Sequence, residues 1–335
     1  MPENKKPTIY DVAKMASCSP ATVSLTLKKS PKIKAETQKR VMAACKQLNF
    51  VPNYFGKGLI TQKTNTIGVI IPNMNNPIFS QMVEGIEEYA NERGYGIFLS
   101  ISNMDKEKEI QSLDLLNTKK ADGLIIFPTY SASLVETIEN REQDCKKIVI
   151  CGTPLISDKI SCVYCDSHLG GYFAVRHLIE RGRRNIALLI PVVNTQQSDE
   201  RLAGYREALE EEGIPFREDM IIQCLPNNAD IYQAVSLFLQ NQRPDAMFCL
   251  YDFSAIAAQK AIINKGLAVP EDIALIGYDN IEIISYLDRP ISTIETHSRA
   301  VGRRAASILV DNLEGKCTDV LREVFMPELV IRKTT

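Results

Sequence analysis

The 335-residue sequence has no apolar run near the roughly 20 residues that an α-helix needs to cross a bilayer. Its first six residues are polar and lack the apolar core of a secretory signal. It also lacks the G-x-S-x-G, G-x-x-x-x-G-K and G-x-G-x-x-G patterns of hydrolases, phosphate-binding loops and dinucleotide-binding enzymes. We therefore expect a cytoplasmic protein that spans no membrane, is not an enzyme and carries no cofactor.

Histidine is scarce, with three residues, which limits the metal sites that the nine cysteines can help to form. Cys162, Cys165 and His168 form a C-x-x-C-x-x-H run, a spacing found in zinc and redox sites. The two cysteines fall in an expected strand, where side chains three residues apart point to opposite faces. Since the cysteine count is odd and no export signal is present, reduced thiols packed in the core are favoured over a metal or redox site.

Positive charge is concentrated at the N-terminal end. Residues 1–63 hold 12 Lys and Arg against 3 Asp and Glu, a net charge of +9, whereas the other residues hold 27 against 38, a net charge of −11. A basic region attached to an acidic body is typical of a nucleic-acid-binding module joined to a different domain. The alternative is a solvated, lysine-rich surface.

The sequence after residue 64 predicts an α/β fold. Short runs rich in Ile, Val and Leu alternate with amphipathic stretches, as expected for buried parallel strands joined by helices. Met82, Ile86 and Ala90, for example, recur with helical periodicity. About ten strands are expected, which is enough for two doubly wound sheets. The clearest strand runs are 66–72, 96–101, 123–127, 147–151, 186–191, 246–250 and 273–278.

The basic region predicts helices. Thr8 and Asp11 have the spacing of a capping box at the start of a helix over 9–16. Ser19 can cap a second helix that has Pro20 at its first position, and a third helix is expected over 35–48. Two short helices joined by about three residues have the dimensions of a helix-turn-helix, so a small all-α DNA-binding domain is favoured over an accidental bundle.

Several motifs occur in the order and spacing of one family. TIYDVAKMASCSPATVS (8–24), LNFVPN (48–53) and TIGVIIP (66–72) are followed by RLAGY (201–205), DIALIGYDN (272–280), STIET (292–296) and ELVIRK (328–333). Together they resemble the LacI/GalR family of bacterial transcriptional regulators over essentially the whole chain from about residue 7. Any one of these motifs alone would be weak.

The resemblance implies a helix-turn-helix headpiece at 1–52, a hinge helix and linker at 53–63, and a core at 64–335 that resembles a type I periplasmic binding protein. The core would be an α/β structure of two doubly wound lobes joined by three crossovers. The first lobe is expected at about 64–162 and 293–325, and the second at about 163–292 and 326–335. A small-molecule effector would bind in the cleft between them, where the carboxyl ends of strands from both sheets meet.

The resemblance also assigns the DNA contacts of the headpiece. The second helix would enter the major groove, with Pro20, Ala21 and Leu25 at base-reading positions and Thr22 and Ser24 near phosphates. Many relatives carry a long polar or basic side chain where this chain has Leu25, so we hypothesise that its operator half-site differs from the family's usual one. The alternative is that Leu25 packs in the headpiece core. The implied contacts in this domain are Thr8, Tyr10, Ser19, Pro20, Ala21, Thr22, Ser24 and Leu25.

The hinge would supply the remaining DNA contacts, Asn53, Lys57 and Leu59. In the family's arrangement Leu59 would enter the minor groove at the operator centre and kink the duplex beside its two-fold partner. Gly56 and Gly58 replace the commoner Ala- and Arg-containing version, and a short glycine-containing helix is unstable alone. We therefore expect the hinge to order only on DNA, with a linker that never becomes helical as the alternative.

In the core, the resemblance implies an effector site made of Phe79, Asp166, Thr195, Gln197, Arg201, Asp252 and Asp279. Phe79 would stack on a sugar face, and Arg201 and Asp279 would bond effector hydroxyls. Their alternative role is a salt bridge between the lobes without ligand specificity, and that of Thr195 and Gln197 is a solvated loop. Pro226 stands at a position that is often aromatic in the family, so the resemblance does not supply a second aromatic platform for stacking on the effector.

The predicted function is a transcriptional regulator, by family frequency a repressor, that binds a pseudo-palindromic double-stranded DNA operator as a homodimer. Its affinity would be switched allosterically by an effector, for which a sugar is the family's commonest case and nucleobases also occur. No leucine heptads follow the ELVIRK motif, so a dimer is expected rather than a lac-repressor-like tetramer. The alternative is a solute-binding protein of the same core fold, which would need a signal peptide and no basic headpiece.

Overall fold

The computed structural model describes residues 7–27, 30–50, 63–129, 131–191, 195–317 and 319–335. The chain divides into two compact units, residues 1–64 and 65–335, each with a hydrophobic core of its own. Among the described residues, no helix combines the length and the apolar character that crossing a membrane requires. The predicted hinge contacts Asn53, Lys57 and Leu59 lie outside the described residues.

The first unit contains the three predicted helices, α1 (Ile9–Met15), α2 (Pro20–Leu27) and α3 (Ala35–Gln47). Both predicted caps are present, because the backbone N of Thr8 donates to Asp11 Oδ2 at 2.7 Å and that of Thr22 donates to Ser19 Oγ at 3.1 Å. Fully buried valines from all three helices form the centre of the core: Val12, Val23 and Val41. The helix-turn-helix expected from the sequence is therefore confirmed.

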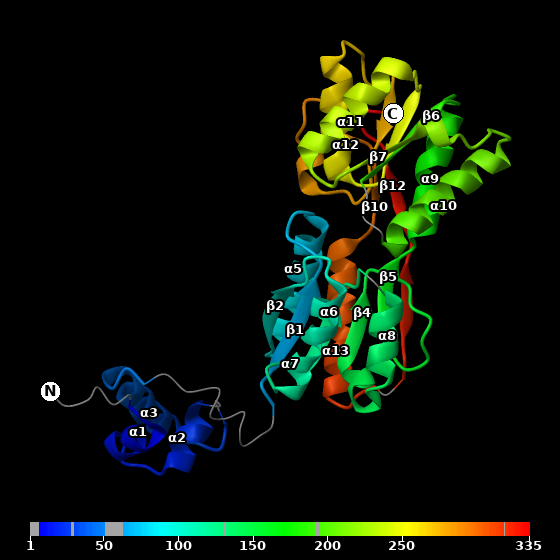
Figure 1. Cartoon of the computed structure of the whole chain (residues 1–335). Coiled ribbons are helices and arrows are strands. Elements are labelled where there is room, and N and C mark those ends of the chain that lie inside the picture. The colour runs from blue at the N-terminus through cyan, green and yellow to red at the C-terminus, as the bar shows by residue number, and fades with distance from the viewer. Residues whose placement is uncertain (1–6, 28–29, 51–62, 130, 192–194, 318) are drawn as a thin grey trace. The chain divides into compact units, whose positions relative to one another are not determined.

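The second unit begins with a six-stranded parallel sheet in the order β2-β1-β3-β4-β5-β11 (Figure 1). The central strands β1, β3 and β4 alternate side chains between two buried faces, which is why they read as continuous apolar runs. The strands are β1 (Thr66–Ile71), β2 (Gly96–Ile101), β3 (Gly123–Ile126), β4 (Ile148–Cys151), β5 (Ser161–Cys165) and β11 (Arg322–Phe325).

Helices cover both faces of this sheet, and together they form the first lobe. On one face, α5 (Ile78–Glu92) and α13 (Ser298–Leu313) pack against Val69 and its neighbours. The opposite face packs against the segment that contains α6 (Lys106–Ser112), α7 (Asp114–Asn117), α8 (Ser131–Glu139) and the 3₁₀ helix η1 (Glu142–Lys147).

The second lobe repeats this design around a four-stranded parallel sheet in the order β7-β6-β8-β9. Helices α9 (Ser167–Glu180) and α10 (Gln196–Glu211) cover one face, and α11 (Asn228–Asn241) and α12 (Asp252–Asn264) the other. The strands are β6 (Ile186–Pro191), β7 (Ile221–Cys224), β8 (Ala246–Cys249) and β9 (Ala274–Ile276), with 3₁₀ helices η2 (Glu218–Met220) and η3 (Glu282–Ser285).

The chain passes between the lobes three times, between β5 and α9, between β10 (Thr293–Glu295) and α13, and between β11 and β12 (Glu328–Val330). Strands β10 and β12 form a separate antiparallel pair that lies between the two sheets (Figure 1). The sequence predicted that the first segment of lobe one ends at about residue 162. In the structure this position lies inside β5, because residues 162–165 are still paired with β11 in the first sheet.

Candidate effector cleft and DNA-binding surface

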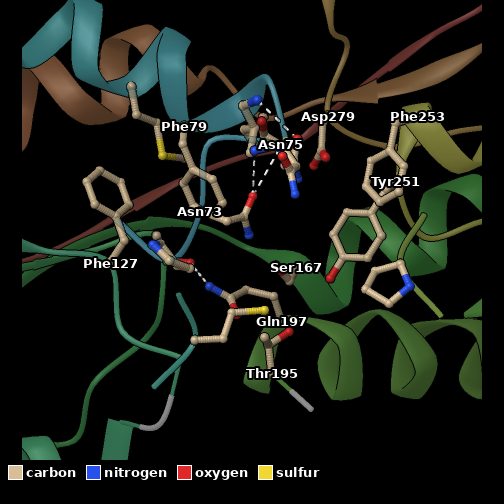
Figure 2. A pocket seen from close by; sticks show the side chains of 18 of the residues that line it. Asn73, Asn75, Phe79, Phe127, Ser167, Thr195, Gln197, Tyr251, Phe253 and Asp279 are labelled. Carbon is tan, nitrogen blue, oxygen red and sulfur yellow. Dashed lines mark hydrogen bonds between the residues drawn. The ribbon is translucent and has the colours of Figure 1, made fainter. Parts of the chain in front are cut away.

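A pocket of about 590 Å³ lies between the two lobes of the second unit (Figure 2). Its walls follow the carboxyl ends of β1, β3 and β4 in the first lobe and of β8 and β9 in the second, where α/β sheets usually bind ligands. Five of the seven predicted effector residues line it: Phe79, Thr195, Gln197, Arg201 and Asp279.

Aromatic side chains form two platforms in the pocket (Figure 2). In the first lobe, Phe79 meets Phe127 edge to face, with 5.9 Å between the ring centroids. In the second lobe, Tyr251 and Phe253 are stacked, with centroids 5.4 Å apart and an interplanar angle of 19°. The second aromatic platform is therefore formed by residues that follow β8, and not at the position of Pro226. Pro226 lines the pocket as an exposed residue.

Arg201 and Asp279 form a buried ion pair at the pocket wall. Arg201 Nη2 donates to Asp279 Oδ1 at 3.2 Å, and Nη1 donates to the carbonyl of Leu250. The guanidinium also lies over the Tyr278 ring, 3.6 Å from its centroid. Both partners belong to the second lobe, so the pair is not the interlobe salt bridge that the sequence left as an alternative.

This ion pair is incompletely satisfied. Arg201 Nε and Asp279 Oδ2 are buried and have no hydrogen-bond partner among the described residues. Burial raises the pKa of the Asp279 carboxyl to about 6, against the opposing effects of Arg201 and of Asn76, which comes from the first lobe. Unpaired buried polar atoms are costly, so a ligand that supplies a donor to Asp279 and an acceptor to Arg201 would be favoured here.

Gln197 joins the lobes across the pocket. Its Nε2 donates to the Gly152 carbonyl at 2.9 Å and to Thr153 Oγ1 at 2.6 Å, both just after β4 (Figure 2). Thr195 caps α10, because its Oγ1 accepts from the backbone N of Ser198 at 3.3 Å. Neither residue is merely part of a solvated loop.

The other two predicted effector residues, Asp166 and Asp252, lie outside the lining. Asp166 caps α9 by accepting from the backbone N of Leu169 at 2.9 Å. Asp252 is fully buried, accepts from Thr293 Oγ1 at 2.6 Å and from the backbone N of Ile281 at 2.9 Å, and thereby anchors the β10 segment. In both places the residues on either side of the aspartate line the pocket instead: Cys165 and Ser167, and Tyr251 and Phe253.

Asparagines are the main pocket residues that the sequence reasoning missed. Asn73 lies in the loop after β1, where its Oδ1 accepts from the backbone N atoms of Asn75 and Asn76 at 2.9 and 3.1 Å (Figure 2). The run Asn73-Met74-Asn75-Asn76 directly after a buried strand was the available signal, because strand ends in α/β folds supply ligand contacts.

The C-x-x-C-x-x-H run does not form a metal site. Cys162 packs in the core on the sheet face that α6, α7 and α8 cover, whereas Cys165 lines the pocket on the other face of β5. His168 Nε2 lies 2.7 Å from Glu207 Oε2. No cluster of His, Cys, Asp and Glu suited to a metal ion occurs in the described part of the chain.

The predicted DNA contacts of the headpiece lie on its surface. Thr8, Tyr10, Ser19 and Ala21 are exposed, and Pro20, Thr22 and Ser24 are half-buried. Leu25 is 37% exposed and lies outside the headpiece core, so the alternative that it is a core residue is wrong.

Comparison with known proteins agrees with this geometry. Residues 8–53 match the family described as bacterial regulatory proteins, lacI family, and residues 175–335 match the periplasmic binding protein-like domain. The HTH-type transcriptional repressor PurR of Aliivibrio fischeri (strain ATCC 700601 / ES114) is 34% identical over 332 residues, which cover 98% of each chain.

Solved structures give the same assignment. The lac repressor dimer bound to operator and the anti-inducer ONPF is 26% identical, with a TM-score of 0.86 and 99% of each chain covered. The transcriptional regulator CelR–cellobiose complex is also 26% identical, with a TM-score of 0.74, covering 98% of this chain and 100% of that one. A helix-turn-helix unit, a two-lobed α/β unit and a close relative of nearly identical extent establish that this chain belongs to the LacI family of bacterial regulatory proteins, as a DNA-binding transcriptional repressor.

Proposed function

We propose that this repressor binds a pseudo-palindromic operator as a homodimer and that an uncharged, polyhydroxylated small molecule, a sugar or sugar derivative, switches its affinity. The observation that carries this proposal is the incompletely satisfied Arg201–Asp279 pair in a pocket lined by both lobes. Adjacent ligand hydroxyls can donate to Asp279 and accept from Arg201 through charge-assisted hydrogen bonds.

The charge of the pocket supports an uncharged ligand. Arg201 and Asp279 are the charged residues among the described residues of the lining, and they neutralise each other. A phosphate or carboxylate would find no unpaired cation there. Amide side chains and two aromatic platforms suit a ring with apolar faces and hydroxyl edges, and the related CelR protein was solved as a cellobiose complex.

Because the ligand would contact both lobes, its binding can be coupled to operator affinity. A ligand held by Arg201 in the second lobe and by Phe79 in the first would stabilise one relative arrangement of the lobes. A coupling free energy of about 1–3 kcal/mol would change operator affinity by roughly 5- to 150-fold.

The deciding experiment is an operator-binding titration on DNA selected by the full chain, with a panel of neutral sugars, their phosphorylated forms and nucleobases. We expect one neutral sugar to change operator affinity at least about tenfold and its phosphorylated form to have little effect. An active nucleobase would overturn the proposed ligand class. If the chain selects no DNA sequence, the operator-binding proposal itself fails.

A second copy of this chain is the proposed partner on the β2 side of the first lobe. Strand β2 pairs with β1 and forms one edge of the sheet, and Phe98, Leu99 and Ile101 on it are 46%, 36% and 40% exposed. An apolar, unprotected edge strand invites pairing with another chain. The similar lac repressor structure is a dimer on its operator, which favours a second copy over another partner.

We expect the double variant Leu99→Glu/Ile101→Glu to be monomeric in sedimentation experiments, because two buried carboxylates would oppose the interface. Its operator affinity should fall about 100-fold or more, since each half-site is then bound separately. Ile156→Glu is the matched control, because Ile156 is 95% exposed and lies away from β2. A double variant that remains dimeric would place the interface elsewhere.

Effector affinity should depend on the ionisation of Asp279. Its pKa of about 6 lies above the usual 3.8, so the folded protein holds this proton more tightly, and the associated stability is lost as the pH rises through 6. A ligand hydroxyl that donates to Asp279 favours the ionised carboxyl. We therefore expect effector affinity to fall by up to about tenfold per pH unit below 6.

The pH dependence can be measured by calorimetric titration of the full chain between pH 7.5 and 5. The Asp279→Asn variant should bind more weakly and show little dependence on pH in this range. An unchanged pH profile in that variant would assign the titration to a group other than Asp279.

A further inference from the structure

The two exposed residues of α2, Ala21 and Leu25, are both apolar. Val23 and Thr26 face the headpiece core and are buried, and Pro20, Thr22 and Ser24 are half-buried, so Ala21 and Leu25 form the outermost part of the helix. Ala21 and Leu25, four residues apart, lie one turn from each other on that side, and both are exposed.

The hydroxyl groups of α2 are largely occupied inside the headpiece. Ser19 Oγ accepts from the backbone N of Thr22 at 3.1 Å and is hydrogen-bonded to Thr22 Oγ1 at 2.9 Å. Thr26 Oγ1 donates to the carbonyl of Thr22 at 2.9 Å. Among the described α2 residues, these bonds leave Ser24 as the main polar side chain on the outer face.

A helix-turn-helix places its second helix in the major groove, and the net charge of +9 over residues 1–63 favours contact with phosphates. In that groove, guanine, cytosine and adenine are read through hydrogen bonds, whereas thymine also presents an apolar group, its C5 methyl. Leu25 and Ala21 have no side-chain hydrogen-bonding group, so direct discrimination by them has to use that methyl.

We propose that Leu25, supported by Ala21, recognises thymine in each operator half-site through the C5 methyl group. This inference rests on the DNA-binding function of the headpiece. Burial of the methyl against Leu25 supplies sequence discrimination, while the basic groups of the headpiece supply affinity that does not depend on sequence. Ser24 remains available for a phosphate or a single base edge.

The test begins with operator DNA selected by the full-length protein. Each thymine of the half-site is then replaced by deoxyuridine, which differs only by the missing methyl. At the position read by Leu25 we expect affinity to fall about fourfold for one half-site and about fifteenfold for both, as for burial of one methyl group each. Other thymines should tolerate the replacement.

Two variants assign the effect to its residue. Leu25→Ala should bind thymine- and uracil-containing operators almost equally, and its folding should be intact because Leu25 lies outside the headpiece core. Met42→Ala is the matched control, because Met42 is an apolar residue of α3 that is 55% exposed, and it should keep the full methyl dependence.

Two results would overturn the inference. One is an operator in which no thymine-to-uracil replacement changes affinity, and the other is a methyl effect of the same size in Leu25→Ala. Failure to select any operator sequence is a separate outcome, since it would refute sequence-specific binding rather than the way in which the half-site is read.

Discussion

Removal of residues 1–64 abolishes operator binding and leaves effector binding intact. This is the largest effect that we expect, because the deletion takes away the helix-turn-helix and the whole +9 charge, while the remaining unit keeps both sheets and their own cores. The remaining chain is acidic and should be repelled by DNA. Fluorescence anisotropy with labelled operator measures the first property, and calorimetric titration with the effector measures the second.

The full chain serves as the control, and its salt dependence gives a second reading. Its operator affinity should fall steeply as salt rises, by roughly 10³- to 10⁵-fold between 50 and 200 mM if six to ten phosphates are contacted. Residual specific binding by the truncated chain would mean that the acidic unit contains a DNA-binding surface, and would contradict the assignment of the headpiece.

Arg201→Ala makes operator affinity insensitive to the effector. The substitution removes the cation that pairs with Asp279 and the donor to the Leu250 carbonyl, and it deprives the ligand of a charged partner. Loss of the charge-assisted hydrogen bond that Arg201 donates to the ligand corresponds to a decrease of roughly 10- to 150-fold in effector affinity. Direct titration of the effector, with operator binding measured in parallel, gives both quantities.

The same substitution is expected to lower the free energy of unfolding by roughly 3–5 kcal/mol, because it leaves Asp279 buried without its cation. Arg201→Lys separates the two effects, since it keeps the charge but loses the planar guanidinium that stacks on Tyr278 and bonds both Asp279 and the Leu250 carbonyl. We expect this variant to fold and to respond poorly to the effector.

Arg206→Ala is the matched control for both variants. Arg206 is an exposed residue of the same helix, 4.3 Å from the centroid of the Phe216 ring, and it is remote from the pocket lining. Its loss should change effector affinity little. A normal effector response in Arg201→Lys and Arg201→Ala would show that the ion pair is only structural.

The elements that the sequence predicted well share a local cause. The headpiece helices were recognisable from their caps, because Thr8, Asp11 and Ser19 act within three residues of their partners. The central strands were recognisable because burial on both faces requires uninterrupted apolar runs, as in β1 and β3. Strands β7 and β11 were not among the clear runs, since one side of each is exposed and carries polar residues such as Gln223 and Arg322.

The candidate site was predicted less completely, and the errors are instructive. Asp166 and Asp252 stand at strand ends, as ligand-binding aspartates do, but the first caps α9 and the second holds the β10 segment. The residue at which the next helix begins decides whether a carboxylate at such a position faces the ligand or bonds the backbone. If the helix began one residue earlier or later, a different side chain would face the pocket. The stacked Tyr251 and Phe253 were overlooked for the same reason.

By itself, the sequence determined the division into a basic helical unit and an acidic α/β unit, most of the secondary structure of both and the family, because charge, caps and hydrophobic periodicity are properties of neighbouring residues. Only the tertiary structure decided which side chains meet in the pocket. Arg201 and Asp279 are far apart in the chain, as are Gln197 and Gly152, and their contacts depend on how two sheets and three crossovers are packed. Burial then sets the charge state of the site, since the pKa of Asp279 reflects its surroundings rather than its neighbours in sequence.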